Sequence, residues 1–279
     1  MNSKPTVDPT FDLTPMEPTR LFDNFYYVGT QSVGSFLINT EDGLIMIDTG
    51  WGGPDCSQIV NDIKNLGLNP GDIKLILISH EHLDHYGGVP YLKKNVCPVA
   101  KVAMSTIGWN YLQERPAEPL GRPYSNPRPQ SIDIFLKDRQ KITMGNIVVQ
   151  IISTPGHTWG CVSFIVPVTD NGKPHMAGIM GGTVLSPDWN NAYHYKASIE
   201  YFQKFTRKSK CDVGLGVHFW GSVEELIALK SRKPWEANPF VIGTEKFESV
   251  YLQKFRDRFQ SAIKQLSPEV LPPIPPWIK

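Results

Sequence analysis

Cysteine is scarce in this chain, and no two cysteines are placed as a functional pair. Four cysteines occur in 279 residues, and none belongs to a Cys-x-x-Cys motif. Cysteines spread this thinly over a long chain do not form a disulfide framework, so we expect free or buried thiols. Cys161 and Cys211 alternate with apolar neighbours, which favours burial as small hydrophobic residues over a role as metal ligands.

Long apolar runs and an excess of one charge are also absent. The chain carries 28 basic and 27 acidic residues, and this balance favours neither nucleic acid nor an anionic membrane as a partner. No stretch is long and apolar enough to span a bilayer. Residues 1–18 are polar and proline-rich and lack the apolar run of a signal peptide. We therefore expect a cytoplasmic protein, provided that no leader has been removed.

Strand and helix patterns alternate along the rest of the chain. Apolar runs predict strands at residues 25–28, 34–38, 44–48, 73–79, 147–153, 162–166 and 176–180. Apolar residues at helical spacing predict helices over 56–66, up to Asn95, around 199–205 and over 247–263. A capping-box pair predicts one more helix, beginning at Ser222. Alternation of this kind is typical of layered α/β proteins.

The same patterns set the expected domain bounds. Residues 1–20 are predicted to form an N-terminal arm, residues 21–266 a single domain, and residues 267–279 a proline-rich C-terminal tail. A further proline-rich segment, residues 108–133, predicts a long irregular loop, because repeated prolines break regular elements. Loops of that length inside a compact domain usually cover a functional site.

The most informative stretch is the hexapeptide His80-Glu81-His82-Leu83-Asp84-His85, which directly follows a predicted buried strand. Neutral imidazoles and an ionised carboxylate are ligands that zinc takes in proteins. His80 and His82 are two residues apart and would not face each other on a helix, so the spacing favours a loop leaving a strand end. The hexapeptide therefore indicates the first half of a two-metal site.

Two further histidines occupy similar positions. His157 and His218 each follow an apolar run and have glycine close by. Both positions are typical of a loop at a strand end that brings one side chain to a shared edge. His175 and His194 do not have this setting.

Together these motifs resemble the metallo-β-lactamase superfamily, whose signature His-x-His-x-Asp-His is matched in full by the hexapeptide. The order of the other elements is also similar: Asp48-Thr49-Gly50 after a strand, then the hexapeptide, then Pro155-Gly156-His157-Thr158, then a late histidine. The resemblance covers about residues 24–222. It implies an α/β protein with the four-layer αββα sandwich of that family.

The resemblance further implies two Zn²⁺ per chain. His80, His82 and His157 would bind the first zinc, and Asp84 and His85 would bind the second.

A departure from a common family pattern bears on the remaining ligand. Many members bridge both metals with the aspartate of a Gly-Asp-Thr segment, but this chain has Gly181-Gly182-Thr183 there. Metallo-β-lactamases with an Asp-His-His second site also lack that aspartate, and a late histidine completes their second metal. His218 fits that role.

Other residues receive supporting roles. Asp84 would orient a hydroxide and relay its proton, and Asp48, Ser79 and Thr183 would support the ligands from outside. Glu81 is expected to point away from the metals. Aromatic residues close to the proposed site loops could wall a substrate pocket: Trp51, Trp109, Trp159, Trp189, Tyr193, His194 and Trp220.

The function expected from the resemblance is a dizinc hydrolase. It would open a cyclic amide (a β-lactam, a γ-lactam or a related cyclic carbamate) with a metal-bound hydroxide. Hydrolysis of a lactone or another ester on the same site is the main alternative. A di-iron redox protein, a nuclease and a non-catalytic binding protein on this scaffold fit the residues less well. The expected partner is a small cyclic molecule, with neither nucleic acid nor a membrane.

Overall fold

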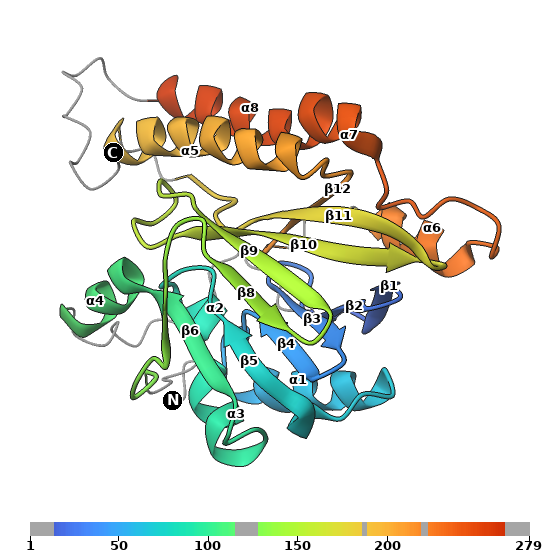
Figure 1. Ribbon diagram of the computed structural model, residues 1–279. Helices are drawn as coiled ribbons and strands as arrows, with labels where there is room; N and C mark the ends of the chain where they lie inside the picture. The colour runs from blue at the N-terminus through green and yellow to red at the C-terminus, as the bar shows by residue number, and fades with distance from the viewer. Residues whose placement is uncertain (1–13, 115–127, 186–188, 219–222, 266–279) are drawn as a thin grey trace, which may run out of the picture.

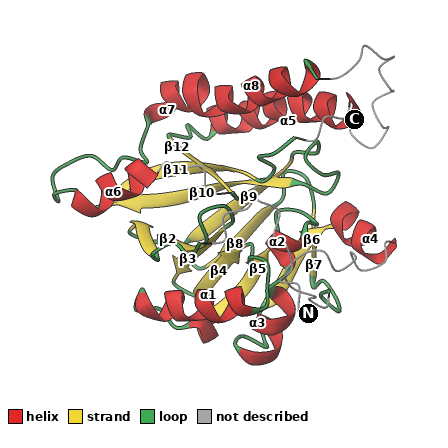
Figure 2. Cartoon of the chain, turned by 180° about the vertical axis from the view of Figure 1, so that it is seen from behind, coloured by secondary structure: helices red, strands yellow, loops and turns green. Residues whose placement is uncertain are grey.

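The computed structural model describes residues 14–114, 128–185, 189–218 and 223–265. Two β-sheets lie face to face in the middle of the molecule, and helices cover the outer face of each (Figure 1). The view from behind shows the same order of layers (Figure 2). This arrangement confirms the predicted αββα sandwich.

The first sheet has seven strands in the order β1-β2-β3-β4-β5-β6-β7. Its strands are β1 (Thr19–Phe22), β2 (Phe25–Gly29), β3 (Gly34–Thr40), β4 (Gly43–Ile47), β5 (Ile73–Leu77), β6 (Lys101–Ser105) and β7 (Ile134–Leu136). The first four strands pair antiparallel, and β4 to β7 pair parallel.

The second sheet has five strands in the order β12-β11-β10-β9-β8. Its strands are β8 (Lys141–Met144), β9 (Ile147–Ser153), β10 (Val162–Asp170), β11 (Lys173–Met180) and β12 (Val213–Gly216). Only β11 and β12 pair parallel, and the other neighbours in this sheet pair antiparallel.

Helices form the outer layers. The first sheet is covered by α1 (Pro54–Asn65) and α3 (Val89–Asn95), and the second by α5 (Trp189–Lys208), α7 (Gly243–Lys246) and α8 (Leu252–Ile263), with a π-helical turn over Phe247–Tyr251 between the last two. Shorter elements are a 3₁₀ turn at Pro70–Asp72, α2 (Leu83–Tyr86), α4 (Thr106–Glu114) and α6 (Val223–Ser231).

The alternation of side chains along each strand explains the layers. In β4, Ile45 and Ile47 join the cluster between the two sheets, while Leu44 and Met46 join the cluster under α1 and α3. In β9, Ile151 faces the other sheet, and Ile152 packs in the cluster beneath α5 and α8. Successive strand side chains point to opposite faces, so an all-apolar strand has an apolar layer on each side.

Most predicted elements appear, and one prediction is wrong in part. Residues 108–114 were expected to be irregular, but they belong to α4, because the prolines of that segment begin only at Pro116. Residues 115–127 lie outside the described part. The last two residues of the predicted arm belong to β1, while residues 1–13 and 266–279 are not described, so the domain bounds stay a prediction. Ser222 is also outside, and α6 begins at the next residue.

Candidate metal centre

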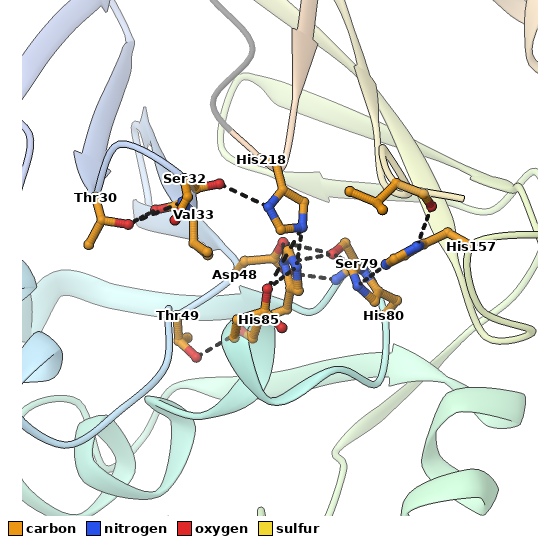
Figure 3. Close-up of polar contacts among 12 residues, drawn as sticks. Thr30, Ser32, Val33, Asp48, Thr49, Ser79, His80, His85, His157 and His218 are labelled. Carbon is orange, nitrogen blue, oxygen red and sulfur yellow. Dashed lines mark hydrogen bonds and ion pairs between the residues drawn. The ribbon is translucent and has the colours of Figure 1, made fainter. Parts of the chain in front are cut away.

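Four loops bring the predicted ligands and the supporting residue Asp48 to one end of the sandwich. Asp48 follows β4, the hexapeptide follows β5, His157 follows β9 and His218 follows β12. Carboxyl ends of neighbouring strands meet along one edge, which explains why residues so far apart in the sequence gather here. Figure 3 shows Asp48, His80, His85, His157 and His218 converging from these loops.

The six predicted ligands form two compact groups. His80, His82 and His157 offer one nitrogen each, and the ligand atoms of the group all lie within 4.8 Å of one another. The same holds for Asp84, His85 and His218. The two groups adjoin, since the rings of His80 and His85 have centroids 3.9 Å apart.

The hexapeptide presents ligands to both groups because its backbone changes conformation within it. His82 is extended and precedes the single helical turn α2, which carries Asp84 and His85. His80 and His85 are fully buried, and Asp84 is 3% exposed. A loop that becomes a helical turn therefore places successive ligands in different directions, as the spacing predicts.

Asp48 orients two predicted ligands by hydrogen bonds, His85 directly and His80 through Ser79. It adopts a left-handed conformation with φ of 57°, which is uncommon outside glycine. Its Oδ2 accepts from the Ser79 hydroxyl at 2.7 Å and from His85 Nδ1 at 2.7 Å, while Oδ1 accepts from the Ser79 backbone amide at 2.7 Å. Figure 3 shows this network.

The network determines which ring nitrogen of each histidine carries a proton. A carboxylate only accepts, so Ser79 must donate its single hydroxyl proton to Asp48. The Ser79 oxygen then accepts from His80 Nδ1, 3.0 Å away. In their neutral forms, His80 and His85 therefore each present an Nε2 lone pair toward the centre.

His157 and His218 are oriented by backbone carbonyls. His157 Nδ1 donates to the carbonyl of Val184 at 2.5 Å, and His218 Nδ1 donates to the carbonyl of Ser32 at 2.9 Å. Their Nε2 atoms consequently also carry lone pairs. A metal-bound histidine commonly has its second ring nitrogen fixed in this way.

The inward nitrogens of each group lie close together. His157 Nε2 is 3.0 Å from His80 Nε2, and His85 Nε2 is 3.3 Å from His218 Nε2. The low pKa of His80 and of His157 keeps both rings neutral, so their Nε2 lone pairs meet without a proton to share, which is unfavourable unless a positive ion joins them. Five imidazoles and one carboxylate, without a thiolate, are a donor set that zinc takes. The residues fit two metal ions.

The electrostatics of the groups agree with this interpretation. Burial and the neighbouring histidines hold the pKa of His80 and of His157 well below the usual range, so both rings are neutral. Burial alone would lower the pKa of His85, but the carboxylates of Asp84 and Asp48 raise it to about 10. Burial would raise the pKa of Asp84, yet His85 and His218 hold it far below the usual range. The centre thus attracts positive charge to its second group.

The position of the missing aspartate is occupied by the His157 side chain. A Cβ at Gly182 would lie 2.5 Å from the Cβ of His157 and 3.1 Å from the sulfur of Cys161. Contacts below about 3 Å are not tolerated between carbon atoms, so no side chain fits at residue 182 without displacing His157. His218 is placed where it can complete the second group instead.

The other predicted site residues are distributed more widely. Thr183 is buried, but within the described residues its hydroxyl has no hydrogen-bond partner, so it does not donate to a ligand. Trp51 and Trp109 pack in the cluster under the first sheet. Trp159 meets His194 with ring centroids 4.9 Å apart, and Tyr193 contacts Phe259. The side chain of Trp189 and all of Trp220 lie outside the described residues.

Three contributors are not predicted from the sequence. The carbonyl of Val184 orients His157, and the carbonyl of Ser32 orients His218 from a hairpin 186 residues earlier in the chain; no residue type marks a backbone acceptor. Glu81 belongs to neither metal group, but it is 3% exposed and bonded to the loop that carries His157. Its charge beside three histidines was the only available signal.

A sequence model of the metallo-beta-lactamase superfamily matches residues 28–170. This chain belongs to the metallo-beta-lactamase superfamily. Members of this superfamily are metal-dependent hydrolases, and the two donor groups fit that assignment. No helix in the described ranges is both long and apolar enough to cross a membrane.

Solved structures of the superfamily are similar over nearly their whole length. The subclass B3 metallo-beta-lactamase BJP-1 of Bradyrhizobium japonicum is 26% identical, with a TM-score of 0.75, 91% of this chain and 96% of that chain covered. The FEZ-1 metallo-beta-lactamase of Legionella gormanii is 27% identical, with a TM-score of 0.72, 90% of this chain and 97% of that chain covered.

Curated relatives match over shorter stretches. Glyoxylase B2 of Dictyostelium discoideum is 31% identical over 50% of this chain and 44% of its own length. A hydroxyacylglutathione hydrolase of Buchnera aphidicola is 29% identical over 53% of this chain and 45% of its own length. This chain spans about half or less of these relatives, so their substrates are not assigned to it.

Proposed function

We propose that this protein is a dizinc hydrolase that opens a cyclic amide, either a β-lactam, a γ-lactam or a related cyclic carbamate. The observation that carries the proposal is the second donor group, Asp84, His85 and His218, together with the steric exclusion of a side chain at Gly182. A site without the bridging aspartate matches the pattern of lactamases with an Asp-His-His second site. The similarity to subclass B3 enzymes supports the same conclusion.

The zinc ions, held by His80, His82 and His157 and by Asp84, His85 and His218, would polarise the substrate carbonyl and make water nucleophilic at neutral pH. Asp48 and Ser79 keep His80 and His85 in the tautomer that leaves Nε2 free. The carbonyls of Val184 and Ser32 do the same for His157 and His218.

Asp84 is the residue that moves the proton. Its carboxylate lies 3.3 Å from His85 Nε2 and 3.7 Å from His218 Nε2, and its low pKa keeps it ionised at neutral pH. One oxygen can orient the attacking water and accept its proton, which then passes to the ring nitrogen as the carbon–nitrogen bond breaks. Ring opening therefore needs no additional acid within this scheme.

Ester or thioester hydrolysis on the same groups is the second candidate. Curated relatives include a hydroxyacylglutathione hydrolase and, in Passalora fulva, an atrochrysone carboxyl ACP thioesterase that is 26% identical over 72% of this chain. The Gly182 position is the observation against it, because enzymes of the glyoxalase type usually retain the bridging aspartate.

A substrate panel combined with metal analysis tests the proposal. Purified protein is assayed for zinc content and then against a chromogenic cephalosporin, a γ-lactam, a benzoxazolinone, an acyl-homoserine lactone and a glutathione thioester. Two zinc ions and turnover of a ring amide are expected, with turnover lost in His218→Ala and retained in His175→Gln, a histidine outside both groups. Turnover of only the lactone or thioester would favour the second candidate, and bound iron without hydrolysis would exclude both.

A further inference from the structure

Glu81 is a buried acid between two predicted zinc ligands that takes no part in either donor group. Its side chain is 3% exposed, although it occupies a position in the hexapeptide that the signature leaves open. Burying a carboxylate is costly unless hydrogen-bond donors compensate for the lost water. The donors that it uses therefore indicate what its burial accomplishes.

Two of those donors come from the loop that delivers His157. The Thr158 hydroxyl donates to Glu81 Oε2 at 2.9 Å, and the backbone amide of Gly160 donates to Oε1 at 3.3 Å. Both donors lie within three residues of His157. Thr158 and Gly160 are 77 and 79 positions from Glu81 in the sequence. Glu81 follows β5 of the first sheet and the His157 loop follows β9 of the second, so the contact joins the two sheets.

Two glycines, Gly108 and Gly160, leave room for this carboxylate because they have no side chain. A Cβ at Gly160 would lie 2.5 Å from Glu81 Oε2 and 2.5 Å from the Cα of Gly108, and a Cβ at Gly108 would lie 3.1 Å from Glu81 Oε2. Ser105 joins the same assembly, since its hydroxyl donates to the Gly160 carbonyl at 2.6 Å and accepts from the Gly108 amide. The start of α4 thus closes over the carboxylate.

We propose that Glu81 is a positioning residue that fixes the His157 loop against the hexapeptide, so that His80, His82 and His157 form one preorganised zinc site. The inference rests on the proposed zinc assignment. His80 and His82 flank Glu81 in the sequence, and His157 precedes Thr158 directly, so one carboxylate sets the distance among all three ligands. Asp48 acts within the first sheet, whereas Glu81 acts across the two sheets.

Zinc affinity provides a test that does not depend on a substrate. Full-length protein loaded with zinc is titrated with a chromogenic chelator, and the two dissociation constants are compared with those of Glu81→Gln. The amide keeps the size of the side chain but turns a donor toward Thr158 or Gly160. Loss of such an outer partner typically weakens metal binding about 10- to 100-fold, and we expect this loss for one of the two zinc ions. Glu245→Gln, an exposed glutamate of α7, is the matched control and should bind both ions normally.

Two further variants separate positioning from a general structural role. Thr158→Val removes one donor with little change in shape and should weaken the same zinc by a smaller factor, so the proposal stays testable if Glu81→Gln fails to fold. In a His157→Ala background, Glu81→Gln should have little additional effect on zinc affinity, because the ligand that it positions is gone.

The outcomes are distinguishable from failure of the zinc assignment. If wild-type protein binds no zinc, the assignment and the proposal fall together. If wild-type protein binds two zinc ions, while Glu81→Gln and Thr158→Val bind them equally tightly and only melt at lower temperature, the contact is structural and the positioning role is wrong.

Discussion

The hexapeptide ligands and the two histidines that join them, His157 and His218, are held by different means. His80 and His85 share side-chain support through Asp48 and Ser79, deep in the first sheet. His157 and His218 instead donate to main-chain carbonyls, those of Val184 and Ser32. Side-chain support can be deleted by one substitution, whereas carbonyl support depends on where the loops lie. The comparison predicts that substituting the residues that support His80 and His85 will weaken metal binding more than substituting those near the carbonyls that support His157 and His218.

Substitution within the hexapeptide should have the largest effect. Asp84→Ala removes both a proposed zinc ligand and the group that relays the proton, and His82→Ala removes a ligand of the other group. Because proton transfer by one positioned group contributes about 10²- to 10⁴-fold, we expect hydrolysis to fall at least 100-fold in Asp84→Ala. Steady-state kinetics, zinc analysis and thermal melting check this. Near-wild-type turnover in a folded, zinc-loaded variant would show that the site is assigned wrongly.

Asp48→Asn should have the next largest effect, and it tests the side-chain half of the comparison. Both carboxylate oxygens of Asp48 accept hydrogen bonds, so in either orientation the NH2 group of the amide would face a donor, either the Ser79 backbone amide or His85 Nδ1. Since Asp48 orients ligands of both groups, we expect both zinc ions to bind about 10- to 100-fold more weakly. Chelator competition measures this, and Asp72→Asn, an exposed aspartate, is the control. Weakening of only one ion would contradict a shared role.

Acid should destabilise the metal-free protein through the same histidines. Burial lowers the pKa of His80, His157 and His218, so the unfolded chain binds protons near pH 6.5 that the folded chain does not. Stability is then lost as the pH falls below about 6.5, by at most about 1.4 kcal/mol per pH unit for each group. The raised pKa of His85 acts at higher pH, where its contribution is lost as the pH rises toward about 10.

Denaturant unfolding of chelator-treated protein at pH 7 and pH 5.5 measures this slope. His157→Gln removes one of the three groups and should make the slope shallower. We expect a lower free energy of unfolding at pH 5.5 than at pH 7. An equal or higher value at pH 5.5 would contradict the proposed neutral histidines.

The same comparison explains what the sequence could predict. The hexapeptide is local, so its residue types and spacing alone indicated ligands. The type of second site was an expectation from the family resemblance, based on the glycine at residue 182. The acceptors of His157 and His218 are carbonyls of Val184 and Ser32, and any residue could supply them. Their positions depend on how two sheets pack, which no single stretch encodes.

Errors in the fold prediction have a similar origin. The strands β1, β6, β7, β8 and β12 were not predicted as strands, and four of these five have no more than four residues, too short to show a clear apolar period. The beginning of α4 was obscured by the prolines that follow it. Trp109 packs against the cluster under the first sheet, and its place in a substrate pocket stays a prediction.

Substitutions in the loops whose carbonyls orient His157 and His218 should have the smallest effect on metal binding. A buried tyrosine hydroxyl supports each of these loops: Tyr195 donates to the Gly182 carbonyl at 3.1 Å, and Tyr27 donates to the Thr30 carbonyl at 2.5 Å. Burial raises the pKa of both phenols well above the usual range, so both remain donors. Removing one such bond by Tyr195→Phe or Tyr27→Phe should cost about 1 kcal/mol of stability.

Zinc affinity should hardly change in either tyrosine variant. In each loop the supported carbonyl is two residues from the one that contacts the histidine. The adjoining strands, β11 for one loop and β2 and β3 for the other, keep their own ladders. Denaturant unfolding and chelator competition on the same samples separate the two effects. A tyrosine variant that loses as much zinc affinity as Asp48→Asn would show that side chains position both sets of ligands alike.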